Sequence, residues 1–342
     1  MTSAASVRNE ARRALFESRL YSAFPLPQAV TTVLIAAVFF GAYAGLSYGH
    51  GRPVLEASGL TVNAQIALIM SLLLATALDL PERARRIWLH EADALRATLE
   101  PAGSSIVDGL AVGQPAHSAA ANWLWFAGGA AVGLGFNALM VSGSGEGVLA
   151  YIDSPGLWPL VVAPGLFGLG GRAIRLMTED DRTISSMVAD HLIVDFADLE
   201  RLHVYGRVGL RSGLIWLIMA GLVLAFLAVQ ASVSVSAISF CLAIAAALWS
   251  MLTLTRPVAA KVEAAKGAAL LEVRRDIVRV HNDGDAPQGR LADLVSYESW
   301  LEKRPVWPVS APVTRRFALY GLIPVLAWFG AAAAELVLDA LA

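Results

Sequence analysis

Residues 315–339 read RRFALYGLIPVLAWFGAAAAELVLD, in which two arginines precede an apolar run that ends at Glu335 and Asp339. About 20 apolar residues in a helix cross the roughly 30 Å hydrocarbon layer of a bilayer. Arginines next to such a run anchor it on the side that they occupy. The stretch therefore predicts a membrane-spanning helix over 317–338, and the rest of the chain decides whether it is a lone anchor.

The composition places the whole chain in the membrane class. Of 342 residues, 56% are hydrophobic and 16% charged, and the mean hydropathy is +0.59, which is too apolar for an ordinary soluble protein. The net charge is −2 and the basic residues form no patch with aromatic neighbours, which excludes a nucleic-acid partner. Cys241, the single cysteine, excludes an internal disulfide and is expected to be a small buried apolar residue.

Seven apolar stretches are long enough to span a bilayer, so we predict an all-α, polytopic membrane protein with seven transmembrane helices. They cover 28–48, 59–78, 121–141, 157–175, 213–231, 233–252 and 317–338. The first stretch resembles the core of a signal peptide and is followed by Ala-x-Ala at 42–44. Glu10 and Glu17 lie in the long segment before it, so we interpret it as an uncleaved span.

The distribution of basic residues predicts the orientation. With a cytoplasmic amino terminus, Arg52 is the only one of the 26 lysines and arginines that falls in an outer loop, which leaves 25 inside. Such an asymmetry sets topology in membranes. The carboxyl terminus is then outside. The chain divides into an amphipathic cytoplasmic segment (1–27), six spans (28–256) with cytoplasmic helical loops at 79–120 and 176–212, a cytoplasmic helical extension (257–314) and the seventh span (315–342).

Helical periodicity extends into the cytoplasmic segments. Pro81 and the charges after it predict a solvated helix that continues from the second span and ends at Pro101. Apolar residues between Ile184 and Leu202 recur at helical spacing and predict one amphipathic helix. The sixth span is expected to run on past residue 257, and a shorter helix follows over 291–304.

Chemistry-bearing residues are sparse. His191, Asp195 and Asp198 would share one face of a continuous helix and are weak candidates for a metal site, although a solvated or salt-bridged face explains them better. No catalytic signature is present, so we expect neither an enzyme nor a cofactor. The lysines all fall in cytoplasmic segments, which excludes a retinal Schiff base.

The fourth span carries Pro159, Pro164 and Gly168 and is predicted to be the shortest and most irregular. A broken span can point to a binding site, and small residues can equally serve close helix packing. Asn137, in the third span, is a polar residue that either lines a pore or bonds to a neighbouring helix.

Two stretches, YGRVGLRSGLIW (205–216) and YESWLEKRPVWPVSAPVTRRFALYGLIP (297–324), resemble segments of multi-pass bacterial inner-membrane proteins without an assigned activity. The resemblance implies a location in the bacterial inner (plasma) membrane. The topology alone is similar to the insect odorant and gustatory receptor channels, which are tetramers with a pore lined by the last helix. That likeness implies architecture only.

Two functions follow as expectations. The first is a homo-oligomeric ion channel or pore, such as a tetramer, with Asn137, Tyr320 and Trp328 near the pathway. The second is a non-conducting signalling or scaffold protein that binds a cytoplasmic protein through residues 176–211 and 258–303. An enzyme acting on lipid is disfavoured, because no reactive cluster lies at a membrane interface.

Overall fold

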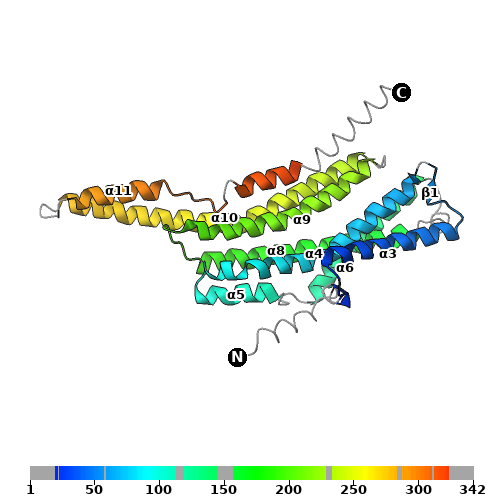
Figure 1. The fold of residues 1–342 in the computed structure, drawn as a ribbon, viewed down its shortest axis with the longest axis horizontal. Coiled ribbons are helices and arrows are strands. Elements are labelled where there is room, and N and C mark those ends of the chain that lie inside the picture. The colour runs from blue at the N-terminus through cyan, green and yellow to red at the C-terminus, as the bar shows by residue number, and fades with distance from the viewer. Residues whose placement is uncertain are drawn as a thin grey trace, which may run out of the picture.

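The computed structural model describes residues 20–21, 23–57, 59–112, 119–144, 157–228, 233–282, 287, 289–309 and 312–322. They are almost wholly helical (Figure 1). The elements, in chain order, are α3 (Gln28–Gly49), β1 (Leu55–Glu56), β2 (Gly59–Leu60), α4 (Val62–Arg96), α5 (Pro101–Val112), α6 (Ala119–Ser144), α8 (Leu157–His191), η2 (Leu199–Leu202), α9 (His203–Ala228), α10 (Val233–Asn282) and α11 (Arg290–Glu302). Residues 312–322 form one further described helical stretch.

Five of the described helices are long and apolar enough to cross a membrane. These segments are Gln28–Gly49, Val62–Arg96, Leu157–Leu176, Leu199–Ala225 and Phe240–Asn282. The all-α fold with several membrane-spanning candidates is therefore confirmed. α6 covers the third predicted span but is not among the five, and the seventh predicted span lies largely outside the described residues.

The helices pair along their lengths (Figure 1). α9 and α10 lie side by side, α6 packs on α8, and α4 contacts α3, α8 and α9. α11 folds back along the far part of α10, so that the two form a helical hairpin that extends past the ends of α8 and α9. This hairpin, residues 263–302 of the described chain, is called the projecting hairpin below.

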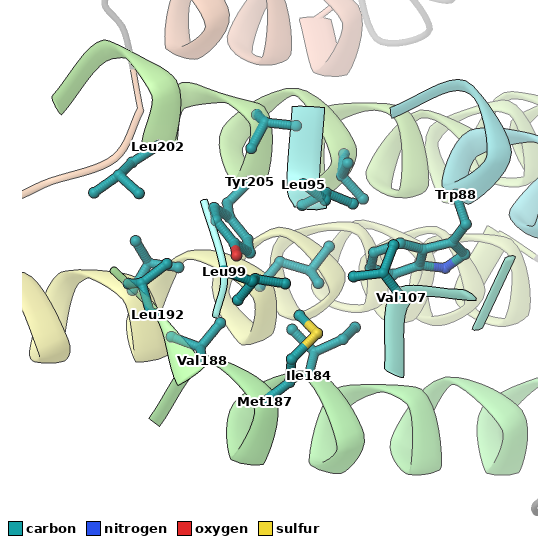
Figure 2. Close-up of a cluster of buried hydrophobic side chains, with 14 of the residues drawn as sticks. Trp88, Leu95, Leu99, Val107, Ile184, Met187, Val188, Leu192, Leu202 and Tyr205 are labelled. Atoms are coloured by element: carbon teal, nitrogen blue, oxygen red, sulfur yellow. The ribbon is translucent and has the colours of Figure 1, made fainter. Parts of the chain in front are cut away.

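Two hydrophobic clusters organise the bundle. One joins α3, α4 and the start of α8, where Trp158 donates its indole N–H to the carbonyl of Phe39 at 2.9 Å and contacts the ring of Tyr43 edge-on. The other is the larger cluster in Figure 2, built from α4, α5, α8, α9 and α10. We call the helices around the first cluster, together with α6, the apolar region, and the surroundings of the second the packed region.

The packed region corrects two predictions. The predicted continuation of the second span past Pro81 is confirmed, because Pro81 lies inside α4, but this part of the helix is not solvated, since Trp88, Ala92 and Leu95 are buried. The missing amide of Pro81 is tolerated because tertiary packing on both sides outweighs one lost helical hydrogen bond. Pro101, at the predicted end of this helix, instead begins a new helix, α5, where its fixed φ suits the first turn.

The predicted amphipathic helix over 184–202 is interrupted. α8 ends at His191, and the chain continues without helix to η2 at Leu199. Backbone bonds from another part of the chain replace the helical ones: the amide of Ile193 donates to the carbonyl of Thr98, and that of Glu100 to the carbonyl of His191. The apolar residues of this segment, among them Leu192 and Leu202, are still buried in the packed region as the periodicity indicated.

Candidate functional site

The metal candidates do not come together. His191 is the last residue of α8, and its Nδ1 lies 3.7 Å from a carboxylate oxygen of Glu100. Asp195 accepts a hydrogen bond from the backbone amide of Ala197, while Asp198 forms an ion pair with Arg201. Their expected common face required an unbroken helix, which the structure lacks. Among the described residues, no group of three or more His, Cys, Asp or Glu side chains is placed to hold a metal ion.

The fourth span is not broken where its prolines lie. α8 runs as one helix from Leu157 to His191, with Pro164 inside it. Pro159 lies in the first turn, where an amide has no helical acceptor to lose. The expectation of an interrupted helix that exposes a binding site is therefore corrected.

Glycines of both helices serve the close packing of α6 on α8. A Cβ added to Gly133 would come within 2.7 Å of the Cα of Pro164, and one added to Gly129 within 2.2 Å of the carbonyl oxygen of Phe167. A Cβ added to Gly168 would lie 2.8 Å from the ring of Phe126, and one added to Gly171 would lie 2.7 Å from the carbonyl oxygen of Trp125. The two backbones are thus in direct contact, which only small residues permit.

The pore candidates have separate surroundings. Asn137 is 1% exposed; its Nδ2 donates to the carbonyl of Pro159 at 3.1 Å, while its Oδ1 has no partner. The amide therefore joins α6 to α8 within one chain. Tyr320 is half-buried in the helical stretch 312–322. Trp328 lies outside the described residues.

Asp79 forms a buried polar centre between α3 and α4. Its carboxylate is fully buried and interacts with Gln28 and Arg83. Tyr21 lies beside it, with its hydroxyl 3.1 Å from that of Thr32. Burial raises the pKa of Tyr21 to about 12, with a smaller contribution from Asp79. A proton stays on this phenol at neutral pH, so it can donate to the carbonyl of Ala75.

A second buried charge was missed by the sequence analysis. The Glu91 side chain is 7% exposed and accepts from two guanidinium groups of α9, those of Arg207 at 3.0 Å and Arg211 at 2.7 Å. Glu91 lies three residues after Trp88 and four before Leu95, so helical spacing alone places it on the buried face of α4. This triad fixes α9 against α4, which is a structural role.

The projecting hairpin has a different character. Arg274 of α10 forms ion pairs with Glu298 at 2.6 Å and Glu302 at 2.7 Å. Lys266 donates to the backbone carbonyls of Glu302 and Arg304, so a cation caps the carboxyl end of α11. Val273 and Leu301 are buried between the helices. The hairpin is a defined element held by contacts of its own.

Apolar side chains remain on the outside of this hairpin. Leu271 is 57% exposed and Val278 59%. Seven residues separate them, which is close to two helical turns, so they lie on one face of α10. We call this pair the exposed row.

Cys241, expected to be buried, is exposed on α10.

Comparisons with models of known protein families, with curated proteins and with solved structures each gave no match. The function is therefore inferred from the geometry of the chain.

Proposed function

We propose that the protein is a non-conducting scaffold of the bacterial inner membrane, which assembles with copies of itself through the projecting hairpin. The exposed row on the projecting hairpin carries the proposal. In this proposal the chain crosses the membrane seven times, with its amino terminus in the cytoplasm. Support for that topology comes from the basic residues, of which 25 fall on one side (26 minus Arg52).

The structure narrows the surface available for assembly. Of the two cytoplasmic stretches expected to bind a partner, 176–211 contributes Met187, Val188, Val204 and Tyr205 to the core of the packed region, where each is at most 1% exposed. The stretch 258–303 instead reaches past the other helices (Figure 1). Of the two stretches, the one that contains the hairpin is therefore the more accessible to a partner.

Charge complementarity favours a second copy as the occupant. Within the hairpin, residues 263–279 of α10 hold four basic and three acidic side chains, a net +1. α11 holds one basic and three acidic side chains, a net −2. Two hairpins related by a two-fold axis place α10 of each beside α11 of the other, which pairs opposite charges and buries both copies of the exposed row.

Pore formation, our first expectation, receives less support. Asn137 bonds to Pro159 within the same chain and is almost fully buried. A residue in that position holds two helices together and does not contact a permeating ion.

The test is to place charge on the exposed row and measure the mass of the purified protein. Leu271→Glu together with Val278→Glu should convert an oligomer into a monomer. Loss of about 1.5 kcal/mol or more per buried apolar side chain weakens association at least about a hundredfold. Ile193→Glu is the matched control, because Ile193 is 50% exposed but lies off the hairpin. This variant should have the same oligomeric mass as the parent protein.

Light scattering in detergent gives the mass, and recording across a planar bilayer gives the conductance. A parent protein that is monomeric at every concentration would overturn assembly through the hairpin. Ion currents that disappear with the monomeric double variant would support the pore over the scaffold.

A further inference from the structure

A groove of about 1070 Å³ runs between α3, α6 and α8, with Leu74 and Leu78 of α4 at its base. It is larger than the pockets of about 300–1,000 Å³ that take ordinary small molecules. Val38 of α3 and Val161 of α8 line it and are 70% and 68% exposed. Its mouth is therefore apolar and opens on segments long and apolar enough to lie within a bilayer.

The polar lining gathers toward one end of the groove. Arg172 of α8 lines it together with Asn122 and Trp123 of α6. Gly171 lies against the backbone carbonyl of Trp125. This contact of α8 with α6 brings the three polar residues to the same end of the groove. Leu34, Val38 and Val161 of the remaining lining are aliphatic. The groove thus has an apolar length and a cationic, hydrogen-bonding end.

Two of these polar groups suit a phospholipid headgroup. A guanidinium binds phosphate oxygens through paired N–H donors. The Oδ1 of Asn122 is buried and accepts no hydrogen bond in the described structure, so a headgroup hydroxyl or ammonium can supply the donor that it lacks. Trp123 is 69% exposed and its ring packs edge-on against Phe126. Exposed tryptophans favour the level of the headgroups.

We propose that this groove is a specific site for an anionic phospholipid, with an acyl chain between α3 and α8 and the phosphate on Arg172. The proposal needs neither self-assembly nor the absence of conduction. It goes beyond the scaffold function by adding a ligand of defined chemistry.

Binding of phosphatidylglycerol and phosphatidylcholine with identical chains to the purified protein, measured by native mass spectrometry, tests the proposal. Both lipids carry the phosphate, but the choline cation of phosphatidylcholine lies beside it and opposes Arg172, so phosphatidylglycerol should bind about tenfold more tightly. Arg172→Gln should abolish that preference. Arg182→Gln, at an exposed position on the same helix, should keep it.

The apolar length is tested separately. Val38→Trp should block both lipids, whereas Val33→Trp, at a 60% exposed position of α3 that does not line the groove, should leave binding intact. Leu34→Trp, also in the lining, provides a second variant if Val38→Trp loses its helical circular dichroism. Glycerol phosphate, which has no acyl chain, should not compete.

Equal binding of the two lipids to the parent, or a preference that survives Arg172→Gln, would overturn the assignment of the headgroup site. Competition by glycerol phosphate would overturn the assignment of a lipid as the ligand and would indicate a soluble phosphate compound. Mass measurements on the same samples distinguish these outcomes from a failure of the scaffold proposal, because Arg172 lies outside the projecting hairpin.

Discussion

The two ends of α8 are packed in opposite ways. In the apolar region, α8 meets α6 backbone to backbone at Pro164 and Gly171, while Val161 stays 68% exposed. In the packed region, Ile184, Met187 and Val188 of the same helix are at most 1% exposed (Figure 2). Burial of large apolar side chains stabilises a protein in water, whereas helices in lipid associate through close contact of small residues. We infer that the solvent around α8 changes between Gly171 and Ile184.

Enlarging a glycine at the α6–α8 contact should have the largest effect. Gly133→Leu places a side chain against the backbone of Pro164, and neither helix can yield without separating. We expect a loss of about 3 kcal/mol or more of stability, at the upper end of overpacking effects. Gly135→Leu on the same helix meets open space and should unfold like the parent. Thermal unfolding in detergent measures both, and equal midpoints would contradict the close contact.

Neutralising Glu91 should have an intermediate effect, confined to the packed region. Glu91→Gln leaves Arg207 and Arg211 without their carboxylate, which should cost about 1–3 kcal/mol. The matched control is Glu272→Gln at an exposed position of α10. Hydrogen exchange should rise in α4 and α9 while α6 remains protected. A uniform rise across all helices would show that the two regions do not unfold separately.

Removing the ion pairs of the projecting hairpin should have the smallest effect. Arg274→Gln separates α10 from Glu298 and Glu302, but exposed ion pairs contribute little. We expect amide exchange in α11 to accelerate roughly two- to fivefold, with no change in the packed region. Arg275→Gln, at a neighbouring exposed position, is the control. Exchange in α11 that stays at the parental rate would indicate that Lys266 and the buried Leu301 suffice.

Helix positions could be predicted from the sequence because length and hydropathy are local properties. The predicted spans beginning at 28, 121 and 157 match α3, α6 and α8 to within two residues at their starts. The interruption after His191 could not be predicted in this way. It depends on backbone bonds to Thr98 and Glu100, about 90 residues earlier in the chain, and no glycine or proline marks it.

The candidate site was harder to predict than the fold. A polar residue in an apolar helix gives the same sequence pattern whether it faces a pore or a neighbouring helix. The role of Asn137 therefore became clear only from its hydrogen bond to the carbonyl of Pro159. Glu91 shows the converse. Its spacing from Trp88 and Leu95 indicates burial, but its partners Arg207 and Arg211 lie on a helix more than 100 residues away.

The length of α10 has a mechanical consequence. Its 50 residues extend about 75 Å at 1.5 Å per residue. Pro257 divides this rod near its middle and is a point where a helix bends readily. A change of about 5° there moves Asn282 by about 3 Å, since the distal half is about 38 Å long. A small tilt among the apolar helices is therefore amplified along α10 into a displacement of its end at Asn282 that is comparable to a hydrogen-bond length.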